Sequence, residues 1–273
     1  MSIVDIDIGE AIHSTGVSIG RGVHSTGIDL GAVTTPFTPG SPASWSDAFN
    51  FAWDPADLIL SNDDPVPSWV DLIGGKSLAQ AVVASQPLFK SAVLGYPAIR
   101  FDGVNDYLFT ADTDLILNGS VATQSAAVFL AMTGAIDVTD VPAVWGDTVT
   151  AANALGFRSA GPTNMGYVRQ TTGNSIVAAT GGTYDPAAVN FIMITASGSE
   201  FKLWIDGTAV HTGAVTGNWV HNRFSIGGWL RATFETPADF DCLGLGLAFG
   251  AEAVALHADP TAMFALASTK WGL

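Results

Sequence analysis

The sequence predicts an all-β sandwich, and three observations support this prediction. Short runs rich in β-branched and aromatic residues recur along the chain, at 125–134, 190–198, 201–213 and 222–229. Turn signals such as "SGSE", "DGT" and "TGN" separate these runs. Almost no stretch has the apolar spacing of a helix. Short strands with regular turns are typical of sandwiches and jelly rolls.

Two local signals refine this prediction. Asp206 and Gly207 lie between two strand-like runs, and an Asp-Gly pair favours a tight hairpin turn with positive φ. One short helix is predicted at the C-terminal end, because Asp259 can cap it and Pro260 fits its first position. Its apolar side is supplied by Met263, Phe264 and Leu266.

Residues 1–44 differ in composition from the rest, and we assign them as an extended N-terminal arm that ends in a Pro/Ser-rich linker. A repeat lies inside: "IHSTGVSIGRG" begins at Ile12 and "VHSTGIDLGAV" at Val23, so His13 and His24 are offset by 24 − 13 = 11 positions. Each copy has the pattern strand, glycine turn, strand. A repeat this short cannot bury its own apolar face. It is therefore either a hairpin on the main sandwich or an assembly arm that docks on another subunit.

The bulk composition argues against several classes of function. The chain has 273 residues, of which 48% are hydrophobic and 13% are charged, and its net charge is −15. Nucleic-acid binding needs a basic footprint, and anionic membrane surfaces repel such a chain, so we expect neither partner. Low charge indicates that partner chains cover part of the surface, which predicts an oligomer. Cys242 is the only cysteine, so neither an internal disulfide nor a thiolate metal cluster is expected.

A series of motifs gives the chain a family resemblance. In order, they are "FAWDPADL" (51–58), "SWVDLIGG" (68–75), "SQPLF" (85–89), "GYPAIRFDGVNDYL" (95–108), "FKLWIDGTAV" (201–210), "FSIGGW" (224–229) and "KWGL" (270–273). The series resembles the laminin-G-like, concanavalin A-like jelly roll found in many bacterial and phage proteins. The resemblance covers about residues 50–273. It implies a jelly-roll domain, which we place at 45–273.

The resemblance implies that "RFDGVNDYL" is a strand that enters a turn. Gly103 would supply the permissive backbone, Asp102 would bond turn amides, and Arg100 would pair with a carboxylate or cap carbonyls. Calcium is the alternative, because some members of the family bind it. Asp102, Asn105 and Asp106 are hard oxygen donors, but calcium prefers about six to eight oxygens. We expect no other cofactor.

The same fold also hosts glycoside hydrolases, and those of the laminarinase type carry an E-x-D-x-x-E cluster. Asp5, Asp7 and Glu10 have this spacing, with Asp in place of the first Glu. The first acid is shorter by a methylene, and the cluster lies outside the part of the chain that resembles the family. Alternating Ile and Asp is also the pattern of a half-exposed edge strand. The chain is therefore predicted to be non-enzymatic.

Aromatic residues suggest a binding site. Trp219, Tyr167 and Tyr184 lie in or near Gly/Thr-rich segments, where exposed rings would stack on sugars. The alternative is that they belong to the core, as most tryptophans of a sandwich do. Trp229 lies at the end of the strand-like run 222–229 and is predicted to be a core residue.

Three functions follow from these observations. The first is a virion structural or adhesion protein, such as a capsid decoration, head-fibre or tail-associated protein. Its arm would anchor to other virion subunits or to copies of itself, and its jelly roll would face outward. Because the start of the chain lacks the pattern of a secretory signal, such a protein would be made in the host cytoplasm. The second is a lectin-like module that binds a host-surface glycan, and the third, the weakest, is a glycoside hydrolase.

Deletion of residues 1–44 is expected to leave thermal melting nearly unchanged and to abolish association, because the arm cannot form a core of its own. Calorimetry and light scattering of the full and shortened chains measure the two effects. A fall in melting temperature by tens of degrees would show that the arm is part of the sandwich.

Overall fold

The computed structural model describes residues 44–73, 75–110, 117–120, 122–146, 154–171, 174–230 and 234–273. All of them belong to one compact unit, Pro36–Leu273. The repeat residues Ile12, His13, Val23 and His24 lie outside the described residues, as do the acids Asp5, Asp7 and Glu10.

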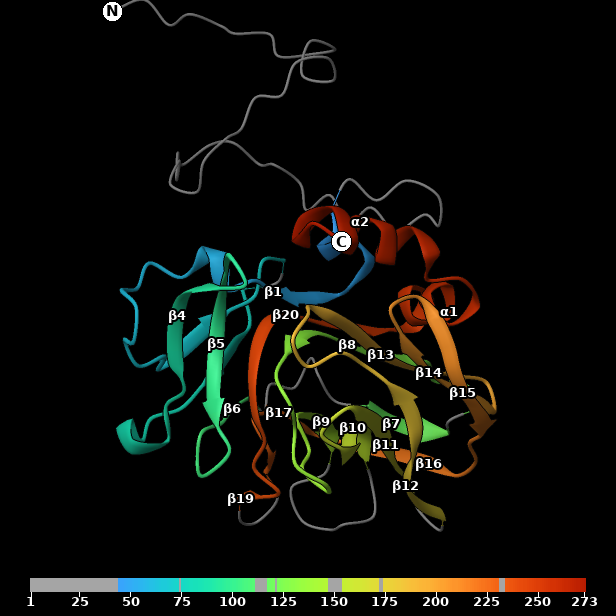
Figure 1. Ribbon diagram of the computed structural model, residues 1–273. Coiled ribbons are helices and arrows are strands. Elements are labelled where there is room, and N and C mark those ends of the chain that lie inside the picture. Colours follow the sequence, from blue (N-terminus) through green and yellow to red (C-terminus); the bar gives the residue numbers. More distant parts are fainter. Residues whose placement is uncertain are drawn as a thin grey trace, which may run out of the picture. The chain divides into compact units, whose positions relative to one another are not determined.

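Two antiparallel sheets face each other in this unit, which confirms the predicted sandwich (Figure 1). In spatial order, the first sheet consists of β15 (Thr208–Ala214), β14 (Glu200–Ile205), β13 (Asn190–Ser197), β8 (Ala126–Thr133), β20 (Asp239–Phe249), β5 (Tyr96–Asp102) and β4 (Leu88–Val93), and β1 (Phe51–Trp53) pairs with β20. The second consists of β12 (Asn174–Thr183), β11 (Asn164–Thr171), β10 (Ala154–Gly161), β9 (Ala143–Gly146), β17 (Arg223–Ile226), β6 (Leu108–Thr110), β3 (Ser77–Ala79) and β2 (Ser68–Val70).

Short elements complete the unit. β16 (Asn218–His221) pairs with β7 (Leu117–Ser120), and β18 (Trp229–Leu230) pairs with β19 (Phe234–Glu235). Three 3-10 turns are η2 (Trp45–Ala48), η3 (Pro55–Asp57) and η4 (Val83–Ser85). The helices are α1 (Gly250–Ala258) and α2 (Thr261–Trp271). Neither helix, nor any other in the described part of the chain, has the length and apolarity to cross a membrane.

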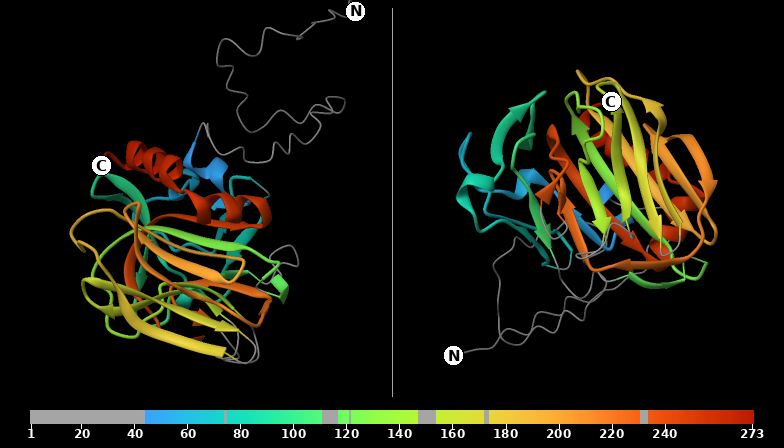
Figure 2. Two further views of the ribbon diagram at one scale, coloured as in Figure 1. Left: turned by 90° about the vertical axis from the view of Figure 1, so that its right-hand side faces the viewer. Right: turned by 90° about the horizontal axis from the view of Figure 1, so that it is seen from below.

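The core between the sheets is aromatic, with Trp53, Trp145 and Phe201 almost fully buried. The centre of the first sheet is also buried on its outer face, since all eight residues of β8 are buried. Along β8, Val128 and Leu130 face the inner core, whereas Ala127 and Phe129 belong to a second cluster formed with the two helices. The helices therefore form a third layer over one sheet, as Figure 2 also shows.

The C-terminal prediction is half right. α2 begins near the predicted position, and the Asp259 carboxylate accepts a hydrogen bond from the Thr261 N–H (2.9 Å). However, α1 was not predicted, because the apolar residues before it continue the pattern of strand β20. Gly250, with φ +63°, marks the change from strand to helix.

Two predicted turns are confirmed. Asp206 and Gly207 have φ values of +47° and +80°, as the Asp-Gly hairpin requires. Arg100 binds Asp241 through two parallel hydrogen bonds, Nε to Oδ1 and Nη2 to Oδ2, both 2.8 Å. Gly103 has φ +71°, a conformation that is strained for residues with a side chain. The "FDG" block is thus a strand that enters a turn.

Cys242 is fully buried in the inner core, as expected for a small apolar residue. Burial raises the pKa of its thiol, since the thiolate would be desolvated.

Gly103→Ala is expected to destabilise the protein by about 1–3 kcal/mol more than Gly75→Ala. Both glycines have φ near +70°, so backbone strain is the same in the two variants. A Cβ at Gly103 would lie 2.9 Å from the Cβ of Asp239, whereas a Cβ at Gly75 has no atom within 4 Å. Denaturant unfolding of both variants measures the difference, and equal losses would contradict the close approach at Gly103.

Candidate functional site

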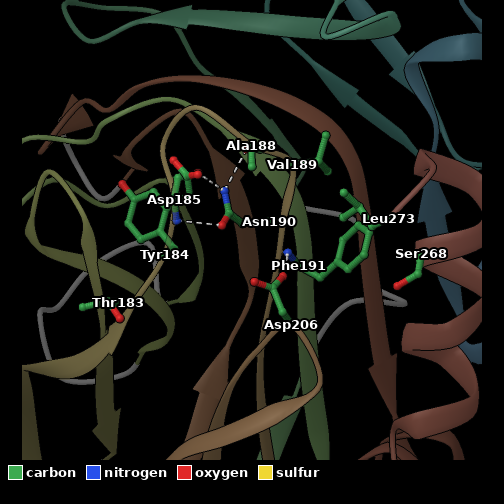
Figure 3. Close-up of a pocket in the computed structure, with 10 residues that line it drawn as sticks. All are labelled: Thr183, Tyr184, Asp185, Ala188, Val189, Asn190, Phe191, Asp206, Ser268 and Leu273. Carbon is green, nitrogen blue, oxygen red and sulfur yellow. Dashed lines mark hydrogen bonds between the residues drawn. The ribbon is translucent and has the colours of Figure 1, made fainter.

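A pocket of about 560 Å³ lies beside the helical layer. Its walls come from the segment 183–191, from the turn between β14 and β15, and from the end of α2 (Figure 3). The lining residues are Thr183, Tyr184, Asp185, Ala188, Val189, Asn190, Phe191, Asp206, Ser268 and Leu273. In Figure 3, Tyr184 and Asp185 lie on one side, Ser268 and Leu273 on the other, and Phe191 and Asp206 between them.

Asn190 fixes the shape of the first wall. Its side chain is 2% exposed, and its Oδ1 accepts a hydrogen bond from the Asp185 N–H (3.0 Å). Its Nδ2 donates to the carbonyls of Asp185 (2.6 Å) and Ala188 (2.9 Å). The loop between Asp185 and Asn190 is therefore held in one conformation before any ligand binds.

Asp206 is oriented with similar rigidity. Its Oδ1 accepts a hydrogen bond from the Phe191 N–H (2.8 Å), and its own N–H donates to the Phe191 carbonyl (2.8 Å). Its Oδ2 accepts no hydrogen bond from the described residues. Although Asp206 is an exposed residue, desolvation of its carboxylate raises the pKa. Asp206 thus presents one oriented oxygen to the pocket.

Asp185 has the same arrangement on the opposite wall. Its Oδ1 accepts a hydrogen bond from the Ala187 N–H (2.9 Å), and its Oδ2 has no donor among the described residues. Hydroxyl groups are contributed by Thr183 and Ser268. The pocket therefore offers several acceptors for ligand donors.

The apolar wall consists of Phe191 and Tyr184. Phe191 is 1% exposed and packs against Trp271, with ring centroids 5.4 Å apart. The Tyr184 hydroxyl accepts a hydrogen bond from the Ile136 N–H (3.2 Å), and burial raises the pKa of the phenol. Oriented acceptors beside apolar carbon suit a ligand that carries many hydroxyl groups.

The predicted sugar-stacking rings are not exposed, which corrects the sequence interpretation. Trp219 is 0% exposed and Tyr167 is 4% exposed, because both point into the sandwich core. The Tyr167 hydroxyl bonds His211 Nε2 at 3.0 Å. Tyr184 does line the pocket, but only 6% of it is accessible. Trp229 is buried, as predicted.

The residues proposed for calcium serve the turn instead. Asp102 Oδ1 accepts hydrogen bonds from the N–H groups of Val104 (2.9 Å) and Asn105 (3.2 Å). Asp106 Oδ2 accepts one from the Asp102 N–H (3.3 Å), and the Asn105 side chain donates to the Ala84 carbonyl (2.5 Å). In the described part of the chain, no three His, Cys, Asp or Glu side chains gather in a way that could hold a metal. This geometry supports the structural interpretation of "RFDGVNDYL".

Sequence reasoning missed the pocket residues Asp206, Asn190 and Ser268. Asp206 was identified only as a turn residue, and the other two were not singled out. They lie far apart in the chain and meet only after α2 packs on the sheet. The one available signal was an acid in a hairpin turn, which by itself is a common structural feature.

No protein-family model matches the sequence, and no curated protein matches it. Among solved structures, a mutant GH54 α-L-arabinofuranosidase has a TM-score of 0.54 and 9% identity, covering 74% of this chain and 51% of the enzyme. The binding domain of botulinum neurotoxin DC in complex with SialylT has a TM-score of 0.48 and 10% identity, covering 78% of this chain and 51% of that one. The NanB sialidase of Streptococcus pneumoniae has a TM-score of 0.38 and 12% identity, covering 49% of this chain and 23% of the sialidase.

The likeness to the arabinofuranosidase supports the fold. The chain spans less than a quarter of the sialidase and about half of the arabinofuranosidase. At such low identity, the likeness to the arabinofuranosidase shows a shared all-β sandwich, and it does not transfer an activity.

Asp106→Asn is expected to stabilise the protein at pH 7 by about 1–3 kcal/mol, since each unit of pKa shift corresponds to about 1.4 kcal/mol. Burial, together with the charge of Asp102, raises the pKa of Asp106 to about 6. The folded state therefore binds this proton more tightly than the unfolded state, so the contribution of Asp106 to wild-type stability should rise as the pH falls from 6 toward 4.

The variant should lose the part of this rise that Asp106 contributes. Chemical denaturation at several pH values measures it, with Asp57→Asn as the control at an exposed acid. An Asp106→Asn variant less stable than wild type at pH 7 would show that its hydrogen bond to Asp102 outweighs the cost of burying the charge.

Proposed function

We propose that the chain is a lectin-like, glycan-binding module whose ligand occupies the pocket of Figure 3. The observation that carries this proposal is the Asp206 carboxylate. One of its oxygens is fixed by the Phe191 N–H, and the other is left without a donor at a pocket with an apolar wall.

The chemistry of sugars fits such a pocket. Sugar hydroxyls are donors, and hydrogen bonds to a carboxylate are about twice as strong as those between neutral groups. The C–H face of a sugar ring can pack on Leu273, which lines the pocket and is 61% exposed, as apolar linings do in ligand sites generally. A volume of about 560 Å³ falls within the range of about 300–1,000 Å³ that is usual for small-molecule sites. The arabinofuranosidase with the same fold was soaked with an arabinofuranoside, which is consistent with a carbohydrate ligand.

A glycoside hydrolase is the alternative, because Asp185 and Asp206 place two carboxylates at one pocket. Against it, one oxygen of each carboxylate is already engaged by a backbone N–H, which suits a fixed acceptor better than a group that must exchange protons. Binding without cleavage is therefore the proposal. Mass spectrometry of the recovered sugar tests it, and cleaved product would overturn it.

A virion location is part of the same proposal. The repeat and linker in residues 1–44 support it, since an anchored arm would leave the sandwich free to bind host-surface glycans. Electron microscopy of the native assembly tests this location. A dispersed monomer would contradict both the virion role and the predicted oligomer.

Asp206→Asn is expected to weaken binding of an identified neutral oligosaccharide by about tenfold, which corresponds to about 1.4 kcal/mol. Asn tolerates positive φ and can still accept the Phe191 hydrogen bond, so only the open oxygen is replaced. A glycan array identifies the ligand, and titration calorimetry measures the affinity.

Asp57→Asn is the matched control, because Asp57 is an exposed acid that does not line the pocket. If Asp57→Asn weakens binding as much as Asp206→Asn does, the pocket is not the site. If no carbohydrate binds the full chain, the proposed function is wrong.

A further inference from the structure

The pocket carries negative charge and no cation. Two of its ten lining residues are charged, and both, Asp185 and Asp206, are acids. Four of the protein's basic side chains form ion pairs with acids that do not line this pocket: Lys90 with Asp63, Arg100 with Asp241, Lys202 with Glu200, and Lys270 with Asp54. The pocket carboxylates therefore lack the neutralising ion pair that each of these other acids has.

This lack of compensation favours a cationic ligand. Desolvation of the Asp206 carboxylate disfavours its ionised form. A ligand cation would reverse this effect, because opposite charges attract more strongly where solvent is partly excluded. The open Oδ2 atoms of Asp185 and Asp206 can each accept a donor, and an ammonium group has three.

We propose that the pocket selects an amino sugar that bears a free ammonium group; this inference rests on the proposed function. The ammonium is held by Asp206, with Asp185 on the opposite wall. The hydroxyls of Thr183 and Ser268, which have no hydrogen-bond partner among the described side chains, bind ring hydroxyls. The ring itself packs on the exposed side chain of Leu273.

The same charges exclude acidic sugars. A sialic acid carboxylate would meet Asp185 and Asp206 without a neighbouring cation in the lining, and the net charge of −15 adds to the repulsion. The ligand class is therefore distinct from the sialylated glycans named with several structures of low similarity.

The experiment compares three tetrasaccharides that differ only at C2 of glucose: cellotetraose with a hydroxyl, its N-acetylamino counterpart, and the free-amine counterpart. Titration calorimetry with the full chain is done at a mildly acidic pH at which the sugar amine is protonated. The free amine is expected to bind at least about tenfold more tightly than the hydroxyl, and this preference should fall as salt is raised. A sialylated trisaccharide should not bind.

Three variants test whether the preference for the free amine arises in the pocket. Asp206→Asn should remove most of the preference for the amine, Asp185→Asn should reduce it, and Asp57→Asn should leave it unchanged. A preference that survives in the double variant of Asp185 and Asp206, or that falls equally in Asp57→Asn, would reflect attraction to the acidic surface as a whole and would overturn the inference.

Two further outcomes separate this inference from the proposed function. If cellotetraose binds as tightly as the amine, the inference is wrong, while the glycan-binding function stands. If none of the sugars binds and a glycan array is also blank, both are wrong.

Discussion

Burial of the central strands of the first sheet on both faces is the constraint on which the rest of the structure depends. Strand β8, and β20 between its two end residues, are buried on the sandwich side and on the outer side, so their outer apolar residues need a cover. The rings that cover β20 pack directly against two of its glycines. A Cβ added at Gly244 would lie 2.9 Å from the Trp271 ring, and a Cβ added at Gly246 would lie 2.7 Å from the Phe49 ring. Glycines at these two positions let large rings lie directly on the strand. The two C-terminal helices and the η2 turn are therefore a required third layer of the domain.

The pocket is a consequence of this layer. Phe191 belongs to the same outer cluster as Trp271, so packing of α2 on the sheet also places Ser268 and Leu273 opposite the segment that carries Asp185. The turn between β14 and β15 brings Asp206 to the same place, and its two hydrogen bonds with Phe191 join the turn to β13. A change in the helical layer would therefore alter the site even though most residues of that layer never touch a ligand.

The sequence was informative wherever structure is local. The hairpin at Asp206-Gly207 and the turn at Gly103 each follow from two or three adjacent residues, and both were predicted. Helix α1 was missed because the apolar run of β20 continues into it, and periodicity cannot locate that boundary. The rings of Trp219 and Tyr167 were interpreted as exposed, because neighbouring turn residues say nothing about which way a strand faces. The pocket depends on three separate segments, so no local pattern could reveal it.

The acids of this protein differ in what their oxygens contact, and this difference separates structural acids from candidate ligand-binding acids. Asp241 is matched by Arg100, and Asp102 accepts turn amides, so their charges stabilise the fold. Asp106 is buried, and its Oδ2 accepts a hydrogen bond from the Asp102 N–H of its own turn, so this contact belongs to the fold. Asp206 combines three properties: an oriented carboxylate, one oxygen with no donor among the described residues, and a pocket large enough for a ligand. Folding requires the first property, since the hydrogen bond to Phe191 holds the hairpin. It does not require the other two, and a ligand with hydrogen-bond donors would account for both.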